Sequence, residues 1–409
     1  STQIHMSSSA ASDDILNRES QSEQVWQRLA VDEWPVPLIL LPAETALVGG
    51  AVRDALLHRL PAQQDLDLVV SSDALGLTQR LHRELGGSFV VLDERRDIAR
   101  LVLRGWTIDI ARREGNSLED DLWRRDYRLN AIALPLKTTP LLVDPTGGLQ
   151  DLAEGRLRAV REANLRADPL RLLRGLRLLA QIPLTLDATT AHWIRNLRHR
   201  LKEAAPERIL AEIEKLVAGP HADVALRHLT QLDLISPWAA HQTLPSLNDA
   251  ALFTSAERQE ALPLARLSGL ISDEGLAQLR ASRALQQRCR RLRYWLQTAG
   301  SKLEQLAEDD RLQLHLDLEA DLPALILHLN RPVQDTWLKR WRDSEDPLFH
   351  PRFPLSGSTL MQVLMMPAGP LIGDLLAHLR KEAAFGRIKG QDQALREAKR
   401  WWAQTRGAL

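Results

Sequence analysis

Two aspartates at alternating positions of an apolar segment are the first residues of this sequence whose types and spacing indicate chemistry. Asp65 and Asp67 open the segment 65–70, whose pattern of alternation predicts a strand. Residues i and i+2 of a strand point to the same face, so both carboxylates would project together. Paired carboxylates repel each other, and a divalent cation is their usual compensation. The pair therefore predicts a metal site, with a solvated pair at a strand start as the alternative.

A glycine pair lies shortly before this segment. Residues 46–50 predict a strand that runs into Gly49 and Gly50, and helical spacing resumes over 52–60. Glycines at such a turn let a phosphate approach the backbone, and the following helix N-terminus supplies free N–H groups. Arg53 could add a charge-assisted contact. The motif thus favours phosphate binding, and an ordinary tight turn is the alternative.

A further acid and a pair of arginines follow. Asp109 lies in the predicted strand 107–111 and is either a third carboxylate on the same sheet or a structural acid. Arg124 and Arg125 end a short predicted helix, where an arginine could reach a triphosphate while Asp126 holds its guanidinium. A surface helix end would explain these three residues equally well.

The segment that starts at Asp168 and Pro169 predicts a helix, because both residues favour helix starts. Leucines form one face of this helix, and Arg171, Arg174 and Arg177 lie on the opposite face. A carboxylate and an arginine one turn apart together offer the acceptors and donors that read the edge of a base. The alternative is a solvated helix face with Asp168 as its N-cap.

The wider pattern indicates an α+β protein. Strands are also predicted over 88–93 and 99–104 and a helix over 73–85, whereas after about residue 150 the strand signal almost vanishes and helical segments follow. Residues 1–5 precede Met6 like a tag remnant, and the Ser- and acid-rich composition of 7–22 predicts disorder.

Composition excludes several classes of protein. The 409 residues carry 53 basic and 53 acidic side chains, so the chain is no polycation, although 156–202 is locally basic in a way that suits RNA. The one cysteine excludes a disulfide framework and Cys-rich metal sites. We find neither an apolar run of membrane-spanning length nor a signal peptide, and therefore expect a cytoplasmic protein without membrane contact.

In this order, the clusters resemble the class II tRNA nucleotidyltransferase and bacterial poly(A) polymerase family. The matching strings are Gly49-Gly50-Ala-Val-Arg53-Asp54, Asp65-Leu-Asp67, Arg124-Arg125-Asp126-Tyr-Arg-Leu-Asn130-Ala131 and Asp168-Pro-Leu-Arg171-Leu-Leu-Arg174. A later Pro206-Glu207-Arg208-Ile209 looks like the family's neck-helix element, and 355–373 looks like its tail.

The resemblance implies a small nucleotidyltransferase head with a mixed β-sheet, followed by an all-helical neck, body and tail. The expected segments are a disordered N-terminus (1–25), the head (26–138), a neck that carries the base-reading residues (139–216), the body (217–335) and a tRNA-binding tail (336–409). The implied reaction transfers a nucleoside monophosphate from CTP or ATP to the 3′ end of tRNA and releases pyrophosphate.

The resemblance also implies roles for single residues. Asp65 and Asp67 would hold Mg²⁺, with Asp109 as a further catalytic candidate. The nucleotide would be bound by Gly49, Gly50, Arg53 and Arg125 at its phosphates, and by Asp168 and Arg171 at its base, with Arg174 and Arg177 nearby.

Two departures from the family pattern bear on specificity. The usual Glu-Asp-x-x-Arg is Ala167-Asp168-Pro-Leu-Arg171 here, which keeps the two base-reading residues. The stretch from Glu114 to Arg124 is shorter than in full CCA-adding members, which resembles the CC-adding subtype and would leave the final A to a partner enzyme. A-adding, CCA-adding and poly(A)-polymerase activities stay open as alternatives. A non-catalytic RNA-binding protein is disfavoured, because both aspartates and the Gly/Arg set that would contact phosphates are present. A metal-dependent phosphohydrolase is also disfavoured, because the sequence has no adjacent His-Asp pair to supply its ligands.

Overall fold

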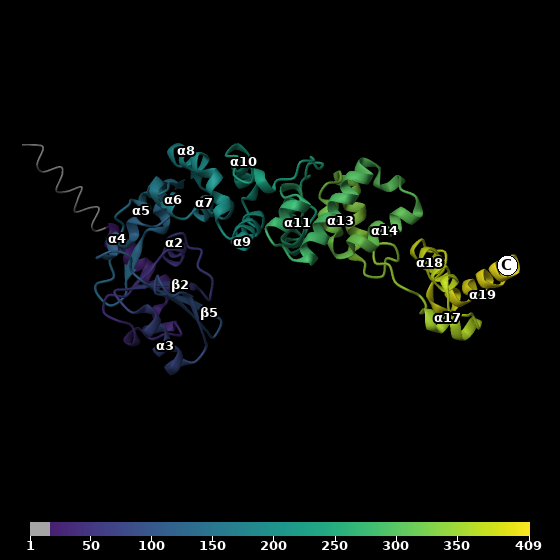
Figure 1. Ribbon diagram of the computed structural model, residues 1–409, viewed down its shortest axis with the longest axis horizontal. Helices are drawn as coiled ribbons and strands as arrows, with labels where there is room; N and C mark the ends of the chain where they lie inside the picture. Colours follow the sequence, from purple (N-terminus) through teal and green to yellow (C-terminus); the bar gives the residue numbers. More distant parts are fainter. Residues whose placement is uncertain (1–16) are drawn as a thin grey trace, which may run out of the picture. The chain divides into compact units, whose positions relative to one another are not determined.

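The computed structural model describes residues 17–409, so the predicted tag remnant and most of the predicted disordered segment lie outside the described residues. The described chain divides into two compact units (Figure 1). Unit 1 runs up to Ala204 and also contains Pro220–Leu234, and unit 2 contains Ala205–Gly219 and Ile235–Leu409. The finer division into head, neck, body and tail stays a prediction.

A six-stranded mixed sheet forms the centre of unit 1. Its strands are β1 (Ala46–Val48), β2 (Asp65–Val70), β3 (Ser88–Asp93), β4 (Ile98–Leu103), β5 (Trp106–Arg112) and β6 (Ala133–Pro135), in the order β3-β4-β5-β2-β1-β6. Strands β2 and β5 pair in parallel, and the other neighbours in this sheet pair antiparallel. This confirms the predicted mixed sheet and, within a residue or two, the predicted strands.

Alternation along β2 decides which of its side chains can do chemistry. Leu66 and Leu68 are buried in the hydrophobic core, whereas Asp65 and Asp67 remain exposed on the other face. The register places Asp67 beside Asp109 on β5. Because side chains alternate with a period of two, a slip of one residue would bury both carboxylates. The apolar face of β2 therefore holds the carboxylates in place.

Helices cover the sheet and extend unit 1. Helices α2 (Gly50–Leu56) and α3 (Ala74–Leu85) contribute side chains to the core beneath β2. Asp73 caps α3 by accepting the backbone N–H of Gly76 at 3.0 Å. The remaining helices of this unit are α4 (Leu118–Trp123), α5 (Gly148–Glu154), α6 (Glu162–Ala167), α7 (Leu170–Gln181), α8 (Ala188–Leu197) and α10 (Ala222–Gln231), with two short strands, β7 (Arg156–Leu157) and β8 (Thr185–Leu186).

Residues 17–29 are helical, which differs from the disorder predicted over 7–22 and the disordered N-terminus expected over 1–25. Val25 and Leu29 are fully buried in the core of unit 1. The Ser22 hydroxyl accepts the backbone N–H of Leu142 at 2.9 Å. The physical reason is that Val25, Trp26 and Leu29 form an apolar stripe at helical spacing, and this stripe outweighs the polar composition around it.

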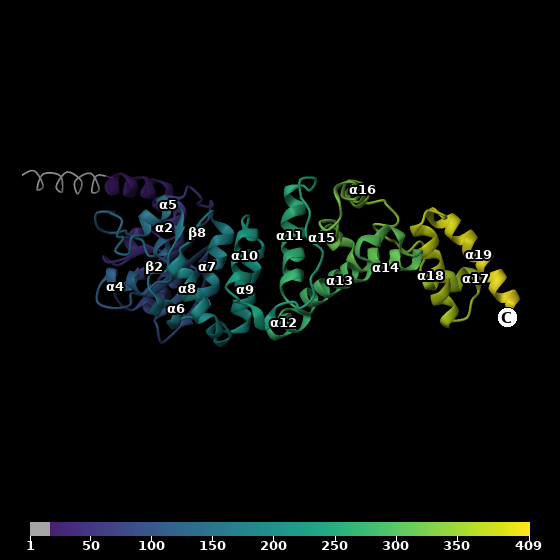
Figure 2. The ribbon, with the colours of Figure 1, turned by 90° about the horizontal axis from the view of Figure 1, so that it is seen from above.

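Unit 2 is built from helices (Figure 2). They are α9 (Pro206–Val217), α11 (Ser255–Leu270), α12 (Asp273–Gln278), α13 (Arg283–Ala299), α14 (Glu308–Leu318), α15 (Leu322–Ile326), α16 (Arg331–Arg342), α17 (Gly357–Leu364), α18 (Pro370–Ala384) and α19 (Gly390–Ala408). Within residues 17–409 we find no helix that combines the length and apolarity needed to cross a bilayer. A mixed sheet followed by helices confirms the predicted α+β class.

Candidate active site

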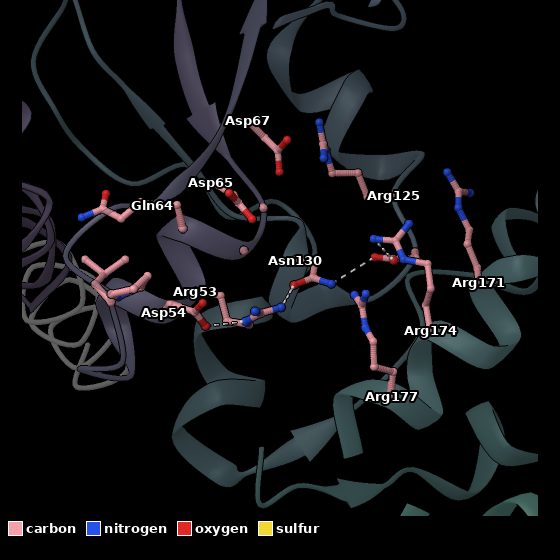
Figure 3. A pocket seen from close by; sticks show the side chains of 16 residues that line it. Arg53, Asp54, Gln64, Asp65, Asp67, Arg125, Asn130, Arg171, Arg174 and Arg177 are labelled. Carbon is pink, nitrogen blue, oxygen red and sulfur yellow. Dashed lines mark hydrogen bonds and ion pairs between the residues drawn. The ribbon is translucent and has the colours of Figure 1, made fainter. Parts of the chain in front are cut away.

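One cavity of about 330 Å³ in unit 1 gathers most of the predicted site residues (Figure 3). Strand β2 contributes the two aspartates, the turn into α2 contributes the two glycines, and α7 contributes three arginines. The predicted residues in its wall are Gly49, Gly50, Arg53, Asp65, Asp67, Arg125, Arg171, Arg174 and Arg177. Segments more than 100 residues apart in the sequence thus meet at one site.

The carboxylates of Asp65 and Asp67 both line this cavity. Asp67 is accessible from it, yet the surrounding protein removes much of the water from its carboxylate. This desolvation, together with the carboxylates of Asp109 and Asp65 and against the opposing effect of Arg125 and Arg174, raises the pKa of Asp67 to about 6. A carboxylate in this position gains most from a cation, so the residues present fit a divalent metal ion.

Asp109 stands beside Asp67 in the sheet but does not line the cavity. Its two carboxylate oxygens accept hydrogen bonds from Nε and Nη2 of Arg100, at 2.7 and 3.1 Å. This fork geometry satisfies both oxygens at once. The predicted catalytic role of Asp109 stays a prediction, and the arginine that holds it was not foreseen.

The glycine turn lies next to the carboxylate of Asp67. Gly49 has φ of +75°, a left-handed conformation that favours glycine, and a Cβ here would stand 3.4 Å from Oδ2 of Asp67. Arg53, one turn into α2, donates to Asp54 at 3.0 Å and to Oδ1 of Asn130 at 2.8 Å. These two partners hold its guanidinium at the wall of the cavity.

The acid that holds Arg125 is not the predicted one. Oδ1 of Asp121 accepts from Arg125 at 3.0 and 3.2 Å, one helical turn earlier in α4. Asp126 instead pairs with Arg174 of α7 at 3.3 Å. Burial would raise the pKa of Asp126, but Arg174 and the Tyr127 N–H outweigh it, so the pKa lies below its ordinary value. The chain turns between Arg125 and Asp126, which sends their side chains to different partners.

Helix α7 presents its arginines to the cavity because its other face is buried. Leu172, Leu173 and Leu176 are fully buried, as the apolar stripe predicted. The guanidinium of Arg171 donates to the Asn164 carbonyl at 2.8 Å, and burial lowers its pKa. Asp168 does not line the cavity: its carboxylate accepts the Leu170 N–H at 3.2 Å, and Pro169 is the N-cap residue.

Sequence reasoning gave no site role to several residues of the cavity wall, of which Asp54 and Asn130 make the contacts just described. Both lie inside the motif strings that carry the resemblance, so their place in those motifs was an available signal. Gln64, which directly precedes Asp65, also lines the cavity.

Comparison with known proteins agrees with this architecture. A family model described as "Poly A polymerase head domain" matches residues 45–158, and one described as "Probable RNA and SrmB- binding site of polymerase A" matches residues 183–247. The crystal structure of the Bacillus stearothermophilus CCA-adding enzyme in complex with CTP has a similar fold, with a TM-score of 0.70 at 21% identity, over 94% of this chain and 99% of that one.

Two relatives show how far the similarity extends. An A-adding tRNA nucleotidyltransferase of Deinococcus radiodurans is 38% identical over 218 residues, which cover 52% of this chain and 48% of that protein. A CC-adding tRNA nucleotidyltransferase of Synechocystis sp. is 34% identical over 397 residues, which cover 88% of this chain and 94% of that protein. With this identity along nearly the whole of a relative, and with the motif residues gathered in one cavity, the chain belongs to the class II tRNA nucleotidyltransferase and bacterial poly(A) polymerase family.

Proposed function

We propose that this protein is a CC-adding tRNA nucleotidyltransferase. It transfers CMP from CTP to the 3′-hydroxyl of a tRNA that lacks its terminal cytidines, uses no nucleic-acid template, and releases pyrophosphate. The observation that carries the proposal is the convergence of the two aspartates of β2 with five arginines on one cavity. A triphosphate needs cationic partners along its length, and its α-phosphate needs a metal beside it.

The arginines divide the work of binding the nucleotide. Arg53 and Arg125 are held from behind by Asn130 and Asp121, so they are oriented before the nucleotide arrives and would contact its phosphates. Gly49 and Gly50 keep the wall beside them free of side chains. Arg171 would donate to the edge of the base, and Asp168 would join it if the start of α7 approaches the base on binding.

Asp65 and Asp67 would hold Mg²⁺. This ion is commonly bound by one or two carboxylates together with substrate phosphates, which matches a pair of aspartates in a nucleotide cavity. When bound, Mg²⁺ would neutralise charge on the α-phosphate and favour ionisation of the attacking hydroxyl. Without a metal ion, the two negative charges of the pair would repel the phosphates of the nucleotide. We therefore expect the nucleotide to bind more tightly when it binds together with the metal ion.

We infer that the enzyme uses CTP and not ATP from the connection between β5 and α4, residues 113–117. Within it, the Glu114 N–H donates to Asp121 at 2.8 Å and the Asn116 N–H donates to Asp120 at 3.0 Å. A connection tied down in this way does not offer the long flexible loop that the resemblance associates with switching from CTP to ATP. A second enzyme would then add the final A, and both would act in the cytoplasm.

The test is incorporation of labelled CTP and ATP, separately and together, into tRNAs that end at the discriminator base, at C and at CC. We expect two cytidines and then a stop. Addition of A to the CC-ended tRNA alone would identify an A-adding enzyme, and completion of CCA would refute the argument from the short connection. Tailing of generic RNA with A, without use of tRNA, would instead favour a poly(A) polymerase.

A further inference from the structure

Tyr127 is a fully buried tyrosine that joins the sheet region to α7. Its hydroxyl donates to the backbone carbonyl of Arg171 at 2.8 Å. In an α-helix that carbonyl accepts the N–H four residues later, which belongs to Gly175. The tyrosine hydroxyl is therefore inserted beside the helical hydrogen bond between Arg171 and Gly175, on the turn of α7 that carries Arg171 and Arg174.

Gly175 is required by this insertion. A Cβ on residue 175 would lie 2.1 Å from the hydroxyl oxygen of Tyr127, 2.5 Å from its Cζ and 3.1 Å from its Cε1. Alanine is the better residue for the interior of a helix. A glycine in the middle of α7 therefore makes physical sense as the partner of a tyrosine hydroxyl that occupies the space of its side chain.

The tyrosine is anchored firmly on its own side. Its backbone forms a bridge with Ala159, and its N–H donates to Oδ1 of Asp126 at 2.7 Å. The next residue, Arg128, donates its N–H to the Arg158 carbonyl at 2.9 Å. Because this segment is fixed, the ring cannot easily retreat, and α7 must adjust to the ring.

We propose that Tyr127 and Gly175 are a matched pair of positioning residues. The Tyr127 hydroxyl packs against Gly175 and sets how closely α7 approaches the sheet. It thereby sets where Arg171 and Arg174 lie in the nucleotide cavity. Neither residue lines the cavity, so neither is a catalytic residue. The inference deepens the proposed function and rests on it, because the position of these arginines matters through the nucleotide they bind.

The size of the effect follows from the distances. A Cβ at 2.1 Å from an oxygen must move away by more than 1 Å to reach ordinary contact. Losing a hydrogen bond between a charged group and the nucleotide costs roughly tenfold or more in the dissociation constant. We expect Gly175→Ala to raise the KM and the dissociation constant for CTP about tenfold or more, and to weaken the preference for CTP over ATP, while kcat changes less.

Tyr127→Phe, Gly175→Ala and the double variant form a cycle that separates positioning from stability. Tyr127→Phe alone should weaken CTP binding by only about threefold, because one neutral hydrogen bond is lost. In the double variant the closest clashing atom is absent, so part of the Gly175→Ala defect should be recovered. Recovery stays partial because the ring carbon at 2.5 Å remains.

Gly269→Ala is the matched control. Gly269 lies in α11, is exposed, and has no atom within 4 Å of a Cβ built on it, so CTP binding and nucleotide choice should not change. For every variant, equilibrium binding of CTP and thermal unfolding are measured beside incorporation into tRNA. Wild-type protein that binds CTP but extends no tRNA would refute the proposed function while leaving the pair testable by binding.

Two outcomes would overturn the matched pair. The first is a Gly175→Ala protein that unfolds at a lower temperature but binds and selects CTP like the wild type, since its role would then be structural. The second is strictly additive defects in the double variant. If Gly175→Ala does not fold, Tyr127→Phe decides alone: unchanged CTP binding and unchanged nucleotide choice would equally refute the proposal.

Discussion

Arginines border a cavity in each of the two units, and the contrast between these cavities explains why we propose only one of them as the active site. The cavity of unit 1 measures about 330 Å³ and that of unit 2 about 1090 Å³. In unit 1 the arginines stand opposite two aspartates on a strand face. In unit 2, Arg311 and Arg340 lie at the wall of the larger cavity against aromatic rings. Volume alone would select the cavity of unit 2.

The difference lies in what contacts each guanidinium. Arg311 lies 4.2 Å from the ring centre of Trp337, and Arg340 lies 4.6 Å from that of Phe349. Arg311 also donates to Nε2 of His315 at 2.9 Å. Burial, together with the charge of Arg340, lowers the pKa of Arg311 to about 10. Aromatic rings thus contact both cations of unit 2, although Arg340 also donates to Asp346 at 2.8 and 3.3 Å. In unit 1, carboxylates and an amide hold the arginines at the cavity wall.

The largest expected effect is that of Asp67→Asn, which removes one of the two proposed metal ligands. Incorporation of CMP should fall by roughly a thousandfold or more, as much as the loss of a strong electrostatic group in other enzymes. Binding of tRNA should persist. The variant should also fold, because it removes a carboxylate whose ionised form the folded protein disfavours. Assays of labelled CMP incorporation, tRNA binding and thermal unfolding check this. Loss of folding would argue for a structural role instead.

The next effect separates the arginines of the two units. Arg174→Ala should weaken CTP binding about tenfold and lower the free energy of unfolding by about 2 kcal/mol, because buried Asp126 loses its partner. Adding Asp126→Asn should restore stability but not CTP binding. Arg311→Met, its counterpart in unit 2, should leave CTP binding unchanged. Titration with CTP and denaturant unfolding measure both quantities, and a CTP defect in Arg311→Met would remove the distinction.

The two regions should also respond oppositely to acid. Burial, together with the nearby charges of Arg311 and Arg340, lowers the pKa of His315 to about 2, whereas the unfolded chain binds that proton near pH 6.5. Stability should therefore fall by up to about 1.4 kcal/mol for each pH unit below 6.5. Asp67 has a raised pKa, so without metal its folded form keeps a proton that the unfolded chain releases, and stability should rise as the pH falls through 6.

Denaturant unfolding of the wild type, His315→Gln and Asp67→Asn between pH 5 and 7.5, in a metal chelator, measures both slopes. The His315 variant should lose the acid-sensitive component, and the Asp67 variant should lose the opposing one. Identical pH profiles for all three proteins would contradict both assignments.

The smallest effect concerns an exposed ion pair in unit 2. Arg387 donates to Glu308 at 2.8 and 3.0 Å and to Glu382 at 2.8 Å, on the surface. Exposed pairs contribute little and are screened by salt. Arg387→Ala should therefore leave CTP binding unaltered and shift thermal unfolding only slightly, and less at high salt. A large loss of stability would mean that this ion pair contributes as much as the contacts of Arg311 and Arg340 with Trp337 and Phe349.

Much of the fold could be predicted because it depends on local periodicity. The alternation of β2 assigns Asp65 and Asp67 to one face, and the leucine stripe of α7 assigns Arg171 to the other side of its helix. These patterns depend only on the geometry of a strand or helix. The same reasoning missed the helix over 17–29, where composition was allowed to outweigh three apolar residues at helical spacing.

The sequence by itself determined which residues are offered to the site: two aspartates on one strand face, two glycines at a turn, and a row of arginines on one helix. Only the tertiary structure decided their partners. Arg53 meets Asn130, 77 residues away, Asp126 pairs with Arg174 and leaves Arg125 to Asp121, and Tyr127 fits against Gly175. The reason is physical: periodicity sets the direction of a side chain, but a hydrogen bond depends on how distant segments pack within a few ångströms.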